Sequence, residues 1–217
     1  MTGQKLLKRD LFGEVALQSG ETGAVIVRDA RPARWWLRPV ARALLRREAR
    51  ALAALDGIEG VPQLLRYDRD TLARSYLAGA PLQRAKTDDR AWFVSAGRLL
   101  RRLHRAGVCH NDLAKEPNLL VLADGSAGII DFQLATHSMK RGRLFRIAAH
   151  EDLRHLLKHK RSYRADLLTT RERHILANPT PLSRAWMGTV KPVYLFITRR
   201  LLGWQDREGA GDRGERE

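Results

Sequence analysis

The sequence contains a single cysteine, Cys109, and no long apolar run. One cysteine excludes an internal disulfide framework and suits a reducing compartment. Residues 1–10 hold no apolar segment of the kind that a signal peptide needs, and no stretch approaches the roughly 20 apolar residues that cross a bilayer. We therefore expect a cytoplasmic protein, with peripheral attachment at the inner membrane face as an open alternative.

Acidic residues are scarce: 24 Asp and Glu stand against 40 Lys and Arg, which gives a formal net charge of +16. Such a charge attracts phosphate-rich partners, among them nucleotides, nucleic acids and anionic lipid surfaces. A coding bias toward arginine would produce the same composition, so the charge alone identifies no partner. The hydrophobic share of 44% in 217 residues is enough for one domain or for two small lobes that share a cleft.

Apolar patterning in the first part of the chain predicts strands and one helix. Residues 11–17 and 24–27 flank a glycine-containing turn, which is the pattern of a β-hairpin. A long helix is expected over residues 40–55, where Asp56-Gly57 ends it. Residues 62–82 contain two more short strands.

The later part of the chain is predicted to be mostly helical. Residues 92–106 form an amphipathic helix that Gly107 ends. Two short strands, residues 119–122 and 128–131, flank the turn sequence Ala-Asp-Gly-Ser. Helices follow over residues 151–158, 170–177 and 193–204.

These elements define an α+β fold with a cleft between two lobes. Residues 1–79 are expected to form a small β-rich N-lobe with one helix. Residues 80–205 form a reduced, mostly helical C-lobe, and residues 206–217 a disordered tail.

One loop holds most of the residues with chemical potential. It lies between the predicted helix 92–106 and the following hairpin, and it reads His-Asn-Asp-Leu-Ala-Lys-Glu-Pro-Asn from His110 to Asn118. The hairpin would return Asp131 to the side of Asn118. Amide and carboxylate oxygens are hard ligands that suit magnesium, and Asp112 would lie close enough to orient a hydroxyl group. The alternative is that these side chains make only local turns and caps.

This segment resembles the catalytic and metal-binding loops of the protein-kinase superfamily, whose patterns are H-x-D-x-x-x-x-N and D-F-G. The short chain is similar to RIO kinases and to bacterial lipopolysaccharide-core sugar kinases over residues 8–160. The resemblance implies a two-lobed protein-kinase-like fold with Asp112 as the catalytic aspartate. Lys115 is grouped with it as a second catalytic candidate, and Asn118 and Asp131 become the magnesium ligands.

Three residues depart from the kinase patterns. Asn118 follows Asp112 by six positions where the family has five, so we expect a bulge within residues 115–117. Gln133 replaces the glycine of D-F-G, which disfavours an in/out flip of that loop. Asn111 stands where regulated kinases carry arginine, which implies that no activation-loop phosphate has to be held.

The N-lobe contributes four candidates for nucleotide binding. Gly13 and Val15 resemble the closing half of a kinase glycine-rich loop, although the two earlier glycine positions are not glycine. Arg28 stands in place of the phosphate-anchoring lysine and differs from it in bulk and reach. Glu48 lies on the apolar stripe of the predicted helix, where a buried carboxylate needs a cationic partner such as Arg28; the alternative is a solvated position at the edge of the stripe.

Other features leave their alternatives open. Asp152 resembles the aspartate that braces a kinase catalytic loop, or it is a helix-start acid favoured by the macrodipole. Trp35 and Trp36 lie in a run of arginines; they pack under the adjacent lobe, or they meet bases or a membrane. Cys109 is expected to be a buried hydrophobe, and the histidines show no metal-ligand spacing.

We expect an enzyme that transfers phosphate from ATP with Mg²⁺ to a hydroxyl acceptor, in the manner of a serine/threonine protein kinase. The alternative acceptor is a lipid-linked sugar, which the basic surface and the absence of an A-P-E peptide-docking sequence would suit. A second class of function is a catalytically weak, kinase-shaped module that binds RNA or a membrane. The sequence does not define the oligomeric state.

Overall fold

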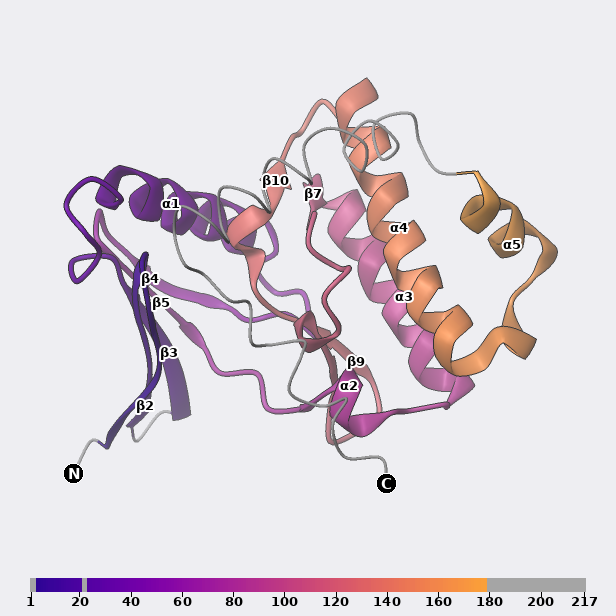
Figure 1. Ribbon diagram of the computed structural model, residues 1–217, viewed down its shortest axis with the longest axis horizontal. Coiled ribbons are helices and arrows are strands. Elements are labelled where there is room, and N and C mark those ends of the chain that lie inside the picture. The colour runs from indigo at the N-terminus through magenta and orange to yellow at the C-terminus, as the bar shows by residue number, and fades with distance from the viewer. Residues whose placement is uncertain (1–2, 21–22, 179–217) are drawn as a thin grey trace, which may run out of the picture. The chain divides into compact units, whose positions relative to one another are not determined.

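The N-terminal strands form one antiparallel sheet (Figure 1). The computed structural model describes residues 3–20 and 23–178. In the order β1-β2-β3-β5-β4, the sheet contains β1 (Gln4–Asp10), β2 (Gly13–Gly20), β3 (Gly23–Asp29), β5 (Thr71–Ser75) and β4 (Leu64–Tyr67). The predicted hairpin is confirmed, since β2 pairs with β3. Strand β1 was not predicted, because its many polar side chains and its exposed edge hide the strand pattern.

A tight turn joins β1 to β2 and corrects the predicted start of the second strand. Asp10 pairs with Gly13, so Leu11 and Phe12 form the turn rather than the strand. The Asp10 carboxylate accepts a hydrogen bond from the Phe12 amide at 2.8 Å, a side-chain interaction that favours turns. Gly13 has φ +129°, and a Cβ there would collide with the carbonyl oxygen of Asp29. The close approach of β3 therefore requires glycine at this position.

Helix α1 (Arg38–Ala54) connects the two hydrophobic cores of this part of the chain. Its N-terminal half packs into a small cluster with Leu72 of β5, and its C-terminal half packs into the larger core of the helical part. Trp35 and Trp36, just before the helix, are 80% and 45% exposed. The expectation that they pack under the adjacent lobe is therefore wrong.

Two long antiparallel helices, α3 (Arg90–Arg105) and α4 (Arg143–Arg164), form the frame of the helical part (Figure 1). Asp89 caps α3 by accepting a hydrogen bond from the Ala91 amide at 2.8 Å. Helix α4 begins well before the predicted residue 151. Its start escaped detection because Gly142 gives no side-chain cap and the first turn has no acidic residue.

Short strands, helices and turns before, between and after these two helices make up the rest of the C-lobe, including the loops that contain the candidate site residues. The predicted hairpin exists as β8 (Leu119–Val121) and β9 (Ala127–Ile129), with β6 (Ala80–Pro81) beside β8. Strands β7 (Val108–Cys109) and β10 (Thr136–His137) pair with each other. The remaining elements are helices α2 (Leu82–Ala85) and α5 (Thr170–Ala177) and the 3₁₀ turns η1 (Glu116–Asn118), η2 (Phe132–Leu134) and η3 (Ala165–Leu167).

The architecture is α+β, with an antiparallel N-lobe sheet and one N-lobe helix followed by a mostly helical C-lobe. The predicted lobe boundary between residues 79 and 80 stays a prediction. The predicted helix 193–204 and the tail 206–217 lie outside the described residues. Within residues 3–20 and 23–178, no helix combines the length and the apolar character of a membrane span.

Candidate functional site

Asp152 of α4 holds the loop that starts at His110. Its carboxylate is buried and accepts hydrogen bonds from the backbone amides of His110 at 2.7 Å and Asn111 at 2.8 Å. His104 of α3 reaches the same carboxylate at 3.2 Å. Because Asp152 lies well inside α4, the helix-start interpretation is wrong. The carboxylate fixes the loop backbone by charge-assisted hydrogen bonds.

The His110 ring connects this loop to the segment after β9. Its Nε2 lies 2.9 Å from the Ile130 carbonyl oxygen, and its Nδ1 lies 3.2 Å from the Asp112 amide nitrogen. A neutral imidazole protonated at Nε2 satisfies both contacts, because one nitrogen then donates and the other accepts. The ring also meets the buried Phe132 ring edge-on, with centroids 4.9 Å apart. The His110 ring therefore connects the backbone at Asp112 to the backbone just before Asp131.

Asp112, Lys115 and Asn118 lie together on this loop. The Asn118 Nδ2 donates to the Asp112 backbone oxygen at 2.9 Å and to its Oδ2 at 3.2 Å. Lys115 Nζ lies 3.1 Å from the same Oδ2. Burial raises the pKa of Asp112 above its ordinary value of 3.8, whereas the Lys115 charge acts to lower it. This carboxylate is thus a better proton acceptor than an exposed one.

The extra residue between Asp112 and Asn118 is accommodated by a 3₁₀ turn, in the range where the sequence predicts a bulge. Asn118 donates its amide to the Lys115 carbonyl at 3.2 Å, and Pro117 lies in the first turn of η1. The turn directs Glu116 toward α4, where the Tyr163 hydroxyl donates to its carboxylate at 2.8 Å.

Asp131 has a left-handed backbone, with φ 67°, a conformation that Asp tolerates better than most residues. Its Oδ1 accepts a hydrogen bond from Arg28 Nη2 at 3.0 Å. Burial acts to raise the pKa of Asp131, but nearby positive charges, Arg28 first, outweigh it and hold the pKa below 3.8. Asp131 is therefore ionised at neutral pH.

Arg28 also contacts Glu48, which is fully buried. Arg28 Nε lies 3.2 Å from one Glu48 oxygen, and Arg74 Nε of β5 lies 3.2 Å from the other. The solvated-edge alternative for Glu48 is therefore wrong. The contacts lack hydrogen-bond alignment, since both Nε atoms and both carboxylate oxygens are buried without a hydrogen-bond partner among the described residues.

Sequence reasoning missed Arg74. Burial lowers its pKa, the Glu48 charge acts against this, and the neighbouring Arg28 charge lowers it further. The available signal was a lone arginine in the otherwise uncharged run of β5. A buried arginine in such a strand requires an acidic partner, and Glu48 is that partner.

Gly13 and Val15 line a small pocket beside Arg28, together with Asp10 and Gln133. Val15 is directly opposite Arg28 across the β2–β3 pair, so the two side chains point to the same face of the sheet. The structure thus brings Val15 and Gly13 to the edge of the Arg28 cluster. Gly13 has a structural reason to be glycine in its contact with β3, which is independent of any ligand.

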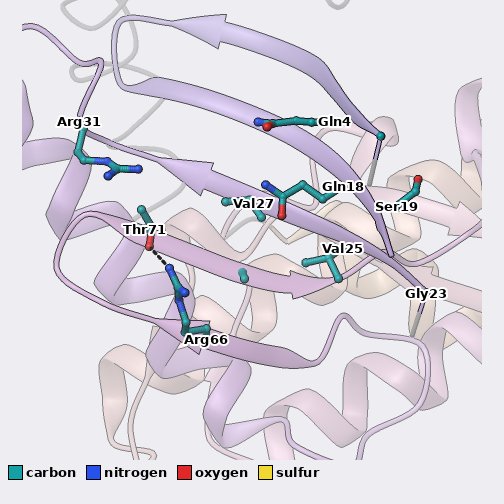
Figure 2. A pocket seen from close by; sticks show the side chains of 11 residues that line it. Gln4, Gln18, Ser19, Gly23, Val25, Val27, Arg31, Arg66 and Thr71 are labelled. Atoms are coloured by element: carbon teal, nitrogen blue, oxygen red, sulfur yellow. Dashed lines mark hydrogen bonds between the residues drawn. The ribbon is translucent and has the colours of Figure 1, made fainter. Parts of the chain in front are cut away.

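A larger hollow lies on the opposite face of the sheet (Figure 2). Val25 and Val27 line it, and they alternate along β3 with Ile26 and Arg28, so they face away from the Arg28 cluster. Arg31, at one end of this hollow, is paired with Asp29 at 2.6 Å. This hollow is not part of the candidate site.

His104, Cys109 and Asp152 form a compact group in which one ligand atom from each residue lies within 4.8 Å of the others. Burial, with a smaller contribution from the Asp152 charge, raises the pKa of the Cys109 thiol to about 12. The Asp152 oxygens already accept hydrogen bonds from the His110 loop. We therefore interpret this group as the brace of that loop, with Cys109 as the buried thiol expected from the sequence.

Asn118 and Asp131 offer oxygen ligands of the kind that Mg²⁺ prefers. The Asn118 amide nitrogen is engaged by two acceptors of Asp112, so its oxygen points away from them. The Ile130 amide donates to the Asn118 carbonyl at 3.0 Å, which places the backbones of Asn118 and the residue before Asp131 side by side. The donor set and its ionisation fit a divalent cation.

Comparison with known proteins identifies a family for the segment that contains the candidate site. The model of the phosphotransferase enzyme family matches residues 11–139, more than half of the 217-residue chain. This segment contains every candidate named above except Asp152. No curated protein matches the sequence.

Solved structures of Rio2 kinase from Chaetomium thermophilum share the fold. One superposes with a TM-score of 0.59 at 17% identity, over 83% of this chain and 60% of that one. Another, a complex with ADP/Mg²⁺ and phosphoaspartate, gives a TM-score of 0.58 at 16% identity, over 87% and 66%. The chain spans less than two thirds of either Rio2 chain. The protein-kinase-like, two-lobed fold is thus confirmed.

Proposed function

Because this chain belongs to the phosphotransferase enzyme family, we propose that it transfers the γ-phosphate of ATP to a hydroxyl acceptor and uses Mg²⁺ to do so. The observation that carries the proposal is the convergence of Asp112, Asn118 and Asp131 through hydrogen bonds of their side chains and neighbouring backbone, with Arg28 bonded to Asp131 at 3.0 Å. An aspartate with only a local role after β9 would not require a partly buried arginine from the N-lobe sheet.

In this proposal, the oxygens of Asn118 and Asp131 hold the metal ion. Bound Mg²⁺ would neutralise charge on the phosphate oxygens. Asp112 orients the acceptor hydroxyl and takes its proton, a role that suits its raised pKa. The acceptor oxygen bonds to the γ-phosphorus as the bond between that phosphorus and the β–γ bridging oxygen breaks. Lys115, 3.1 Å from Asp112, stabilises the ionised carboxylate and would be within reach of a phosphoryl group transferred at Asp112.

We assign phosphate anchoring to Arg28. It is held by Glu48 on one side and by Asp131 on the other, so a metal ion on Asp131 would free one face of the guanidinium for phosphate. Arg74 keeps Glu48 partnered during this exchange. Gly13 and Val15 would border the nucleotide from the sheet side, next to Arg28.

The Arg28 assignment has a direct test. We expect Arg28→Ala to weaken ATP binding, measured by calorimetry in the presence of Mg²⁺. The matched control is Arg31→Ala, which removes an exposed arginine two residues after the end of the same strand. Equal ATP affinity of Arg28→Ala and the parent protein would remove Arg28 from the site.

The first candidate acceptor is a serine or threonine side chain of a protein, as the protein-kinase-like fold favours. The second is a hydroxyl of a lipid-linked sugar, which is favoured by exposed apolar and basic side chains after Asp131: Met139 and Leu144 are each 78% exposed. Transfer from radiolabelled ATP into fractionated lysate distinguishes them, because the label enters either protein or glycolipid.

The competing function is a kinase-shaped binding module without useful turnover. The substitution of arginine for lysine at position 28 favours it. Asp131→Asn separates the two, because an enzyme loses ATP turnover on this change while its fold persists. If the parent protein transfers no phosphate to any fraction, the enzyme proposal fails.

A further inference from the structure

Four arginines surround an open pocket at one end of the α3–α4 pair. The pocket has a volume of about 400 Å³ and is lined by Arg101, Arg105, Arg141 and Arg146 with His104 and Phe145. None of the described residues that line it is acidic. Among the described residues, none of the four arginines makes an ion pair.

The positions of the two helices explain this concentration of charge. Helices α3 and α4 run antiparallel side by side, so the end of α3 lies next to the start of α4 (Figure 1). Arg101 and Arg105 are one turn apart in the last turns of α3, and Arg146 lies in the first turn of α4. Among the described residues these like charges converge without counter-charges, and their mutual repulsion favours the binding of an anion.

The start of α4 adds to the attraction for anions. Gly142 provides no side-chain cap, and the first turn contains no acidic residue. Within the described part of the chain, no side-chain cap satisfies the first amide N–H groups of the helix, and the helix dipole adds partial positive charge at this end. Arg141 reaches the pocket from a left-handed backbone with φ 41°, a conformation that costs energy in arginine.

Exposed apolar side chains flank the arginines. Met139 and Leu144, each 78% exposed, lie on either side of Arg141 in the chain, and Arg143 and Lys140 are also exposed. Large apolar side chains interleaved with arginines are typical of surfaces that lie in the interface of an anionic bilayer. A nucleic acid would use the arginines but would leave Met139 and Leu144 in water.

We propose that this surface, formed by the arginine pocket with Met139 and Leu144, docks the protein on a membrane of anionic phospholipids. A headgroup phosphate occupies the pocket among Arg101, Arg105, Arg141 and Arg146, and the two apolar side chains enter the acyl boundary. The docking does not depend on catalysis. Its role in presenting a lipid-linked hydroxyl to Asp112 rests on the proposed function.

Two side chains link the docking surface to the loop that contains Asp112. His104 lines the pocket and contacts Asp152 at 3.2 Å. Asp152 in turn holds the amides of His110 and Asn111. An anion in the pocket would therefore lie one side chain away from the brace of the loop that contains Asp112.

The test measures co-sedimentation of the full chain with vesicles of equal parts phosphatidylglycerol and phosphatidylcholine. The variant Arg101→Gln/Arg105→Gln removes two pocket arginines and keeps good helix formers. We expect it to lower vesicle affinity about 30-fold, because each arginine near an anionic surface contributes roughly fivefold. The matched control is Arg98→Gln/Arg102→Gln, which removes two exposed arginines with the same spacing from the same helix, outside the pocket.

A second variant tests the apolar part. Met139→Gln/Leu144→Gln keeps every charge and is expected to weaken vesicle binding, while Leu65→Gln, an exposed apolar position on β4, is expected to have no effect. Equal losses in the pocket pair and its control would overturn the proposal, because they would show a diffuse charge effect. Equal binding to vesicles of phosphatidylcholine alone would also overturn it.

Two further measurements separate a lipid headgroup from a soluble phosphate or RNA as the ligand, and separate membrane docking from catalysis. Saturable binding of inorganic phosphate without vesicle binding would assign the pocket to a soluble phosphate compound and would contradict the lipid proposal. RNA binding that the Met139/Leu144 variant leaves intact, in a protein that does not bind vesicles, would contradict it as well. Asp131→Asn should still bind vesicles. Loss of transfer with retained docking would leave the surface inference standing whatever the outcome for catalysis.

Discussion

The two halves of the candidate site are held in different ways. The loop around Asp112 is fixed by hydrogen bonds, with the Asp152 carboxylate on two backbone amides at 2.7 and 2.8 Å. The cluster around Arg28 is held mainly by charge, with two arginines at 3.2 Å from Glu48 and no aligned hydrogen bond to that carboxylate. Under the proposed function, the first arrangement would position a reacting group before substrate arrives, whereas the second would exchange partners when a phosphate enters.

The largest expected effect tests the loop around Asp112. Asp112→Asn should lower kcat by roughly 10²- to 10⁴-fold, because the acceptor proton loses its base. The dissociation constant for ATP should stay close to that of the parent protein, since Arg28 and Asp131 are unchanged. Steady-state kinetics and calorimetry on the same preparation provide both values. A large loss of ATP affinity would show that the two halves are not separate.

The next largest effect tests the cluster around Arg28. Glu48→Gln leaves two buried arginines with only Asp131 as counter-charge and should destabilise the fold by about 3 to 5 kcal/mol. This corresponds to a fall in melting temperature of roughly 10 °C. The control, Glu59→Gln, changes an exposed carboxylate and should alter the melting temperature little. Equal melting temperatures would mean that the buried charges do not stabilise the cluster.

A smaller effect is expected at the brace of the catalytic loop. Asp152→Asn removes the charge and one acceptor oxygen, so one of the two loop amides loses its partner. We expect a loss of about 1 to 3 kcal/mol in unfolding free energy and a lower kcat with unchanged ATP affinity. Asp88→Asn is the exposed control. If Asp152→Asn weakened ATP binding and left kcat unchanged, the loop around Asp112 would serve nucleotide binding and not the chemical step.

The smallest effect is a shift in pH dependence. Asp112 must be ionised to accept a proton, and burial raises its pKa above 3.8 against the lowering effect of Lys115. Lys115→Met should raise this pKa further, so the acid limb of the kcat/KM profile should move to higher pH. Lys5→Met, on the exposed strand β1, should leave the limb in place. A shift to lower pH would contradict the proposed Lys115–Asp112 interaction.

The loop half of the candidate site was largely predictable from the sequence, because Asp112, Asn118 and Asp131 follow one another along a loop and a hairpin whose turn signals are local. The extra residue before Asn118 could be located within residues 115–117 for the same reason. The contact of Glu116 with Tyr163 could not, since it depends on the packing of a helix far along the chain.

The N-lobe half was only partly predictable. The apolar stripe of the helix indicated that Glu48 needs a cation, and Arg28 was available on a neighbouring strand. Arg74 was missed because strand register determines which side chains share a face, and the pairing of β3 with β5 is a long-range contact. The arginine pocket depends in the same way on the antiparallel packing of α3 and α4.

The most direct test of the central claim is calorimetric titration of ATP with and without Mg²⁺. In the parent protein, Mg²⁺ should strengthen ATP binding, because the proposal assigns Asp131 and Asn118 as the residues that would hold the ion. In Asp131→Asn, Mg²⁺ should no longer strengthen it. The same enhancement by Mg²⁺ in both proteins would contradict the assignment of Asp131 as a metal ligand and with it the proposed phosphotransfer site.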